Sequence, residues 1–305
     1  MFGAVEAGGT KFICAVGPSP DKLLAKVSFP TTSPQETLAK VNEFFLQQIE
    51  ENGALRAIGL GSFGPINISR QSADFGKLAA TPKKGWAGFD IVKAISKTVN
   101  TDVALETDVN CALLGEAAFG SGKGVEDLAY ITIGTGIGGG LMNKGRLIQG
   151  YSHPEIGHML AVRHPDDQDF PGICAFHGGQ CFEGLASGPA IEKRWACKAV
   201  ELDKNHKAWK IQGYYIAALC MNLLLSVTPK RIILGGGVMN QRQLFPIIRE
   251  ELTSLLAGYI DLASNNLNLQ EVIVPAGLDG EGALQGAILL AKQYVDENVS
   301  HQQSG

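Results

Sequence analysis

The chain has 305 residues, of which 45% are hydrophobic and 18% charged, and this composition is sufficient for two buried cores of ordinary size. Its formal net charge of −4 provides no electrostatic footprint for nucleic acid. Residues 1–16 lack the basic start and continuous apolar run of a secretion signal, and the longest apolar run, 216–227, is too short to span a bilayer. The six cysteines are unevenly scattered, as reduced cytosolic thiols are, so we expect a cytoplasmic protein. From the charge and the short apolar runs we expect it to bind neither nucleic acid nor membrane.

The first half of the chain alternates strand patterns with helix signals. Residues 1–29 predict short strands separated by a glycine-rich turn and a polar turn. Ser33, Pro34 and Glu36 then supply an N-cap, a proline at the first helical position and a glutamate three residues after the cap, which predicts a helix that Gly53 ends. Strands are expected at 57–60 and 103–105, and a helix at 109–119.

The second half begins in the same way as the first. A strand at 128–133, a glycine turn at 134–140 and a second strand from 141 repeat the opening of the chain. Helices are expected at 211–227, 244–256 and 282–294, with strands at 231–234 and 272–274 between them. We therefore predict a duplicated α/β fold whose two lobes enclose a cleft: a small lobe, 1–119, completed by the C-terminal helix 285–298, and a large lobe, 120–284.

Three glycine-rich turns are candidates for binding phosphate or nucleotide. Segment 6–11 places Gly8 and Gly9 before Thr10 and Lys11, a pattern that suits phosphate binding but also an ordinary hairpin turn. Segment 134–140 is neither a Rossmann fingerprint, since no helix opens after it, nor a P-loop, since no Gly-Lys-Ser/Thr follows. Segment 235–237 follows a strand and can lie under an adenine or ribose.

Asp108 lies where a predicted strand ends and a helix begins. One interpretation is an N-cap for that helix. The other is a general base, because strand ends are where α/β proteins place reacting groups and a carboxylate there can accept a hydroxyl proton during phosphoryl transfer. Asn110, two residues on, is placed to hold a neighbouring hydroxyl.

A metal-binding pattern follows in the large lobe. Cys174, His177 and Cys181 have the spacing C-x2-H-x3-C in a glycine-rich loop with little core of its own, which predicts a stabilising zinc ion rather than a chance pair of cysteines. His158 is the expected fourth ligand in preference to His153 or His164. Four protein ligands would close the site and make the zinc structural.

Taken together, these motifs resemble the ROK family (repressors, open reading frames and sugar kinases), which has the actin-like ATPase (ribonuclease H-like) fold. The match spans nearly the whole chain. The chain matches the family's signature pattern at Ile133, Gly136, Ile137, Gly138, Gly140 and Leu141, and then at Gly150, Pro154, Gly157 and His158. The chain resembles the bacterial fructokinase branch of the family in segments 6–12, 64–65, 81–83 with Trp86, and 106–110.

The resemblance implies ATP-dependent phosphorylation of a hexose, with D-fructose as the expected substrate, and it implies roles for single residues. Asp108 matches the catalytic base. Positions that match ATP contacts are Gly8, Gly9, Thr10, Lys11, Thr135, Gly136, Pro189, Gly235, Gly236, Gly237 and Asn240. Positions that match sugar contacts are Gly64, Pro65, Asp108, Asn110, Glu155 and Glu183. Positions that match ligands of a structural zinc ion are His158, Cys174, His177 and Cys181.

Two departures from the family pattern bear on cofactor and substrate. Many relatives have aspartate where this chain has Glu6, so Mg2+ is expected to be ligated mostly by water and phosphate oxygens. Glucose-specific members usually carry C-x-C-G-x2-G-C and an asparagine near position 83, whereas this chain has His177 in the metal motif and Lys83 in the loop. These differences favour fructose.

Two alternatives stay open. A kinase for mannose, glucose or an N-acetylhexosamine differs from a fructokinase by only a few contacts. A sugar-sensing regulator of the same family would add an N-terminal helix-turn-helix, for which a phosphate turn beginning at Glu6 leaves no room. The family also favours homodimers, which are the commonest oligomers of soluble enzymes.

Overall fold

The computed structural model describes residues 1–81, 83–278 and 280–303. The chain divides into two compact units. The first comprises Met1–Ala118, Gln149–His153 and the C-terminal segment from Leu278, and the second comprises Phe119–Ile148 and Pro154–Gly277. Segment 149–153 lies within the range that the sequence assigns to the large lobe, yet it packs with the first unit.

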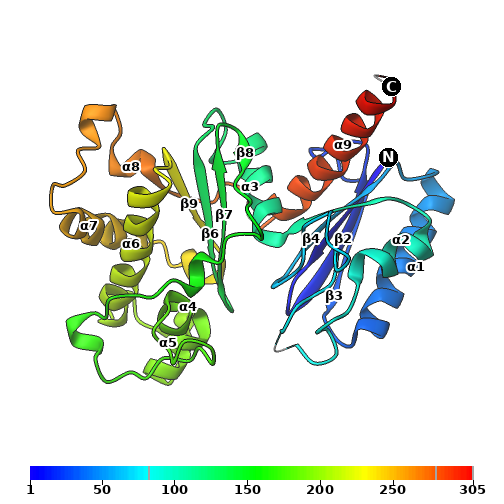
Figure 1. Ribbon diagram of the computed structural model, residues 1–305. Helices are drawn as coiled ribbons and strands as arrows, with labels where there is room; N and C mark the ends of the chain where they lie inside the picture. The colour runs from blue at the N-terminus through cyan, green and yellow to red at the C-terminus, as the bar shows by residue number, and fades with distance from the viewer. Residues whose placement is uncertain (82, 279, 304–305) are drawn as a thin grey trace. The chain divides into compact units, whose positions relative to one another are not determined.

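The first unit is built on a five-stranded mixed sheet in the order β3-β2-β1-β4-β5. Figure 1 labels β2, β3 and β4 of this sheet. Strands β1, β2 and β3 are antiparallel neighbours, and β1, β4 and β5 are parallel. Its elements are β1 (Phe2–Ala7), β2 (Lys11–Gly17), β3 (Ala25–Pro30), α1 (Pro34–Asn52), β4 (Ile58–Ser62), α2 (Ile91–Val99), β5 (Val103–Thr107), α3 (Asp108–Phe119) and α9 (Gly282–Gln303).

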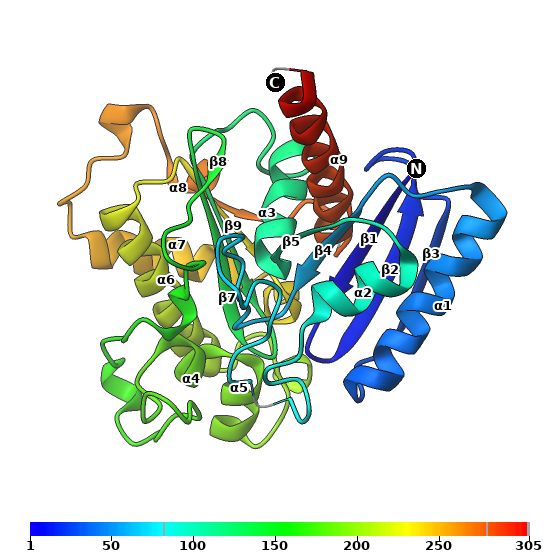
Figure 2. The same cartoon turned by 45° about the vertical axis from the view of Figure 1, so that its right-hand side comes forward.

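Helices cover both faces of this sheet, α1 and α2 on one and α9 on the other (Figure 2). Because neighbouring strand residues point to opposite faces, Ile58 faces α1 while Gly59 faces α9. A Cβ on Gly59 would lie 1.8 Å from the carbonyl oxygen of Ala287 in α9, so the helix backbone packs directly on the strand. Gly286 approaches α3 as closely, since its Cβ would lie 1.8 Å from the Cys111 carbonyl oxygen.

The second unit has a five-stranded sheet in the order β10-β9-β6-β7-β8. Its strands and α-helices are β6 (Leu128–Ile133), β7 (Ile137–Asn143), β8 (Arg146–Leu147), α4 (Phe182–Ala186), α5 (Gly188–Trp195), α6 (Ala208–Ser226), β9 (Arg231–Gly235), α7 (Leu244–Leu256), α8 (Leu269–Val272) and β10 (Ile273–Pro275). Short 3-10 turns lie at Ile156–His158, Pro165–Asp167, Ala199–Glu201, Gly237–Asn240 and Ala263–Asn265.

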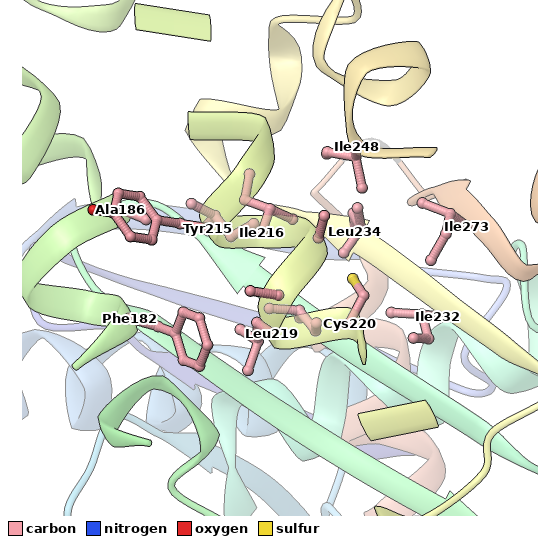
Figure 3. Close-up of a cluster of buried hydrophobic side chains, with 14 of the residues drawn as sticks. Phe182, Ala186, Tyr215, Ile216, Leu219, Cys220, Ile232, Leu234, Ile248 and Ile273 are labelled. Atoms are coloured by element: carbon pink, nitrogen blue, oxygen red, sulfur yellow. The ribbon is translucent and has the colours of Figure 1, made fainter. Parts of the chain in front are cut away.

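The core of the second unit centres on α6, which is apolar on nearly all sides, as expected for a largely buried helix. Ile216, Leu219 and Cys220 of this helix pack against Ile232 and Leu234 of β9 (Figure 3). The same cluster includes Ile248 of α7 and Ile273 of β10. The first unit has its own separate cluster, so each unit has the hydrophobic core that its composition predicts.

The two sheets have the same topology. In each, three sequential strands pair antiparallel. A fourth strand pairs in parallel with the first of the three, and a fifth pairs in parallel with the fourth. This correspondence extends the predicted duplication from two matching glycine turns to two complete α/β units. Among the described residues, no helix is long and apolar enough to cross a membrane.

Candidate active site and metal centre

Three candidate segments of the first unit meet at one edge of its sheet. Ala7, Ser62 and Thr107 are the last residues of β1, β4 and β5, and they are register partners across these parallel strands. The segments that follow them therefore begin side by side at the carboxyl edge, which is where open α/β sheets bind ligands. These segments are the Gly8–Lys11 turn, the cis-linked Gly64 and Pro65, and the start of α3 at Asp108.

The glycines of the 8–11 turn are needed for different reasons. Gly8 donates its amide to the Lys11 carbonyl oxygen at 3.0 Å, and a Cβ there would lie 2.8 Å from the same oxygen. The turn is tied to the end of β3 by the Thr31 hydroxyl, which donates to the Gly8 carbonyl at 2.7 Å. Gly9 has no positive φ, and a Cβ there would meet no described heavy atom within 4 Å beyond its chain neighbours. The protein fold therefore does not require glycine at position 9, whereas the close approach of a ligand would.

Thr107, rather than Asp108, caps helix α3. The Thr107 hydroxyl oxygen accepts the Asn110 amide at 3.1 Å, which is the usual geometry of an N-cap. Asp108 is the first residue of the helix, and its Oδ1 accepts the amide of the next residue, Val109, at 2.9 Å. Of the two interpretations of Asp108 from the sequence, the capping role therefore belongs to its neighbour.

Glu6 lies one residue before the end of β1 and is half-buried. Burial raises the pKa of its carboxyl group, while the nearby Lys11 and Lys26 ammonium groups lower it. Its Oε2 has no hydrogen-bond partner among the described residues. A buried carboxylate oxygen without a donor is suited to a cation or to an ordered water.

The candidate nucleotide segments of the second unit also gather at one sheet edge. Gly235 ends β9 and is the register partner of Thr132 in the parallel strand β6, so segments 134–136 and 236–240 start side by side. Gly188, just before Pro189, donates its amide to the Gly134 carbonyl at 2.7 Å and brings the start of α5 to the same place. A Cβ on Gly237 would meet no described heavy atom within 4 Å, so space is left above this backbone.

His158, Cys174, His177 and Cys181 form one cluster in the second unit, and their ligand atoms all lie within 4.8 Å of one another. The His158 Nδ1 atom is 3.9 Å from Cys174 Sγ and 3.7 Å from Cys181 Sγ, and His177 Nδ1 is 3.6 Å from Cys174 Sγ. Sulfur and nitrogen ligands of tetrahedral zinc are about 3.6 Å apart. Burial raises the pKa of the Cys181 thiol to about 11, so a metal ion would be needed to hold it as a thiolate at neutral pH.

Glu183 joins this cluster to the glycine turn. Its Oε1 lies 3.7 Å from Nε2 of His158, the ring nitrogen that faces away from the two sulfur atoms. Its Oε2 accepts the Ile137 amide at 2.9 Å, and a Cβ on Gly136 would lie 2.6 Å from that oxygen. A carboxylate on the outer nitrogen of a metal-binding histidine fixes its tautomer and orientation.

A buried ion pair anchors the loop between His158 and Cys174. Arg194 of α5 donates from Nε and Nη2 to the two oxygens of Asp167 at 2.8 and 3.0 Å, and the Tyr215 hydroxyl donates to Asp167 at 2.7 Å. His164 is engaged in this loop, because its Nδ1 accepts the amide of Asp166 at 3.0 Å. It is therefore not the fourth member of the cluster, and His153 belongs to the other unit.

Comparison with known proteins agrees with this architecture. A model of the ROK family matches residues 2–294. The chain belongs to this family. It is 41% identical to a fructokinase from Pediococcus pentosaceus over 292 residues, which cover 96% of this chain and 98% of that protein. It is 39% identical to a fructokinase from Zymomonas mobilis subsp. mobilis over 294 residues, covering 95% and 96%.

The structure resembles that of a ROK family glucokinase from Streptomyces griseus in complex with glucose and AMPPNP. The TM-score is 0.73 at 22% sequence identity, and the match covers 96% of this chain and 99% of that one. The ROK family has the actin-like ATPase fold, which is therefore the fold of this chain.

Two residues of the fructokinase-like segments, Glu106 and Trp86, make contacts that the sequence did not indicate. Glu106 accepts hydrogen bonds from Asn110 and Gln149, and no spacing rule connects residue 149 to residue 106. Trp86 is fully buried and donates its indole N–H to the Thr32 carbonyl at 2.9 Å, which ties Trp86 to the segment that follows β3. Pro82, which belongs to the fructokinase-like segment 81–83, lies outside the described residues.

Proposed function

We propose that this protein is a homodimeric kinase that transfers the γ-phosphate of ATP to D-fructose, forming fructose 6-phosphate. Membership of the ROK family supports a sugar kinase, and the fructokinases that are 39% and 41% identical over nearly the whole chain support fructose. The observation that carries the proposal is the common carboxyl edge of β1, β4 and β5, where a glycine turn, Gly64 and Asp108 follow neighbouring strands.

In the first unit, Asp108 is the general base. Its carboxylate accepts the proton of the 6-hydroxyl while that oxygen forms a bond to the γ-phosphorus and the bond to the departing ADP breaks. The Gly8–Lys11 turn binds phosphate oxygens through backbone N–H groups and the Thr10 and Lys11 side chains. Gly64, Pro65 and Asn110 contact the sugar.

In the second unit, Thr135 and Gly136 contact phosphate. Pro189 and the Gly235–Asn240 segment contact the adenosine part, for which the open space above Gly237 leaves room. Glu155 and Glu183 accept hydrogen bonds from sugar hydroxyls. The orientation of Glu183 by the Ile137 amide supports this role, because it fixes one carboxylate oxygen and leaves the other near His158.

The residues present fit two metal ions. The unpartnered Glu6 Oε2 is suited to Mg2+, either directly or through a water ligand, and the ion would neutralise phosphate charge. The His158, Cys174, His177 and Cys181 cluster has the donors and spacing of a closed structural zinc site. There, His158 would bind zinc through Nδ1, which faces the two sulfur atoms, and the Glu183 carboxylate 3.7 Å from its Nε2 would favour that orientation of the ring.

Substitution of Gly9 by alanine should weaken ATP binding without weakening the fold. A methyl group there meets no described heavy atom within 4 Å beyond its chain neighbours, but it would occupy the space where phosphate oxygens approach the backbone. We expect KM for ATP to rise about tenfold, with KM for fructose and the melting temperature nearly unchanged. Gly8→Ala is the matched variant: its Cβ strikes the Lys11 carbonyl, so the melting temperature should fall as well. Equal kinetics for Gly9→Ala and the wild type would contradict the phosphate role.

Initial rates with a panel of sugars test the substrate. Fructose should have a higher kcat/KM than mannose, glucose, N-acetylglucosamine or N-acetylmannosamine at saturating ATP. If one of the other sugars has the highest value, the protein is a hexose kinase of a different specificity. No ADP formation with any of them would reject the kinase function itself.

A further inference from the structure

Glu106 is a buried carboxylate that contacts the proposed sugar-binding residue Asn110. It is the penultimate residue of β5 and is 7% exposed. Its Oε2 accepts the Asn110 side-chain amide at 2.8 Å and lies 3.4 Å from the Thr107 backbone nitrogen. Its Oε1 accepts the side-chain amide of Gln149. Burial raises the pKa of this carboxyl group, and the bonds from Asn110 and Gln149 act in the opposite direction.

These contacts determine how the Asn110 amide is oriented. An ionised carboxylate only accepts hydrogen bonds, so the NH2 end of Asn110 must face Glu106 and the carbonyl end must face away. The backbone of Asn110 is held separately, because its amide donates to the Thr107 hydroxyl. The Asn110 side-chain oxygen, Oδ1, is buried and has no hydrogen-bond partner among the described residues. A buried acceptor without a donor is costly unless a ligand supplies one.

We propose that Glu106 is a positioning residue that orients the Asn110 amide so that its carbonyl oxygen accepts a hydrogen bond from a sugar hydroxyl. The inference rests on the proposed function, since it takes Asn110 to contact the sugar. It adds the direction of that hydrogen bond and the residue that sets it. The sugar hydroxyl is the donor in this contact.

Gln149 extends the arrangement to the protein surface. Glu106 and Gln149 both line a cavity of about 590 Å³ in the first unit, whose wall also includes Tyr294 and Glu297 of α9. Because Gln149 lies on the chain segment 149–153, which joins the first unit from within the second half of the sequence, local sequence patterns could not associate it with Glu106. Gln149 satisfies the oxygen that Asn110 does not use.

The test is a double-mutant cycle on sugar affinity. Glu106→Met keeps the side-chain length but removes both acceptor oxygens, so Asn110 is free to turn. The dissociation constant for fructose, measured by calorimetry without ATP, should rise about tenfold. Glu106→Gln should restore most of the affinity, because its carbonyl oxygen can still accept from Asn110 while the exposed Gln149 side chain turns. In Asn110→Ala protein, Glu106→Met should cause no further loss.

Glu297→Met is the control, because it removes a carboxylate that lines the same cavity but makes no hydrogen bond to Asn110 in the described structure. Fructose affinity should not change in this variant. A full additional tenfold loss on adding Glu106→Met to Asn110→Ala, or no rescue by Glu106→Gln, would overturn the inference. Turnover of ATP and fructose by the wild type tests the proposed function separately, so the two can fail independently.

Discussion

Asp108→Asn protein should bind fructose normally but phosphorylate it about a thousandfold more slowly than the wild type. General bases contribute roughly 10²- to 10⁴-fold to such reactions. Asparagine has nearly the same shape as aspartate and its side-chain oxygen can still accept the Val109 amide, but it cannot accept a proton at neutral pH. Steady-state kcat, together with fructose affinity from calorimetry, measures the two effects separately.

Thr107 makes this substitution a clean one, because it caps α3 through its own hydroxyl and the asparagine oxygen keeps the bond from the Val109 amide. Asp90→Asn is the matched control in the same unit: Asp90 caps α2 by accepting the Lys93 amide at 2.8 Å, and asparagine caps equally well. This variant should keep full activity. If Asp108→Asn retained more than about a tenth of the wild-type kcat, Asp108 would not be the base.

The sequence predicts the parts of the fold that have strong local patterns. The N-cap and glutamate at 33–36 predict α1, which spans Pro34–Asn52, and the amphipathic pattern of 244–256 predicts the observed bounds of α7. Helix α2, Ile91–Val99, was missed because it is short and follows a long loop. The return of segment 149–153 to the first unit depends on long-range packing and has no local signal.

Candidate site residues were predictable to a similar extent. Strand ends followed by glycines identified the segments after β1, β6 and β9, since such turns have a recognisable composition. The capping of α3 was not predictable, because Thr107 and Asp108 are adjacent and both residue types form good caps. Glu106 was not identified either: a glutamate inside a strand has no sequence pattern that shows which side chains it meets.

The metal cluster combines a local pattern with one distant residue. Spacing alone brings Cys174, His177 and Cys181 into a single loop, whereas His158 had to be chosen from three histidines. Geometry distinguishes them: His158 Nδ1 lies 3.7 Å from Cys181 Sγ, and His164 instead accepts a backbone amide. The short turn Ile156–His158 holds this histidine, and Glu183 contacts its other ring nitrogen.

Wild-type protein should contain about one zinc ion per chain by elemental analysis, and Cys174→Ser protein should contain less than about a tenth as much. A serine hydroxyl is a poor zinc ligand, and the loop from residue 159 to 180 would keep the Asp167–Arg194 ion pair but lose its second attachment. Amide exchange in residues 170–181 should therefore become faster, with less change near Asp167. Activity should fall too, because His158 would no longer be held beside Glu183.

Cys197→Ser is the control, since this free and partly exposed thiol belongs to the same unit but not to the cluster. It should keep both the zinc and the activity. Loss of zinc from Cys174→Ser protein but not from Cys197→Ser protein would distinguish a metal site from a chance group of cysteines and histidines. Zinc stabilises the loop only if it binds the folded protein. If wild-type protein without metal kept full activity and slow amide exchange in residues 170–181, packing alone would hold the loop and the zinc hypothesis would be wrong.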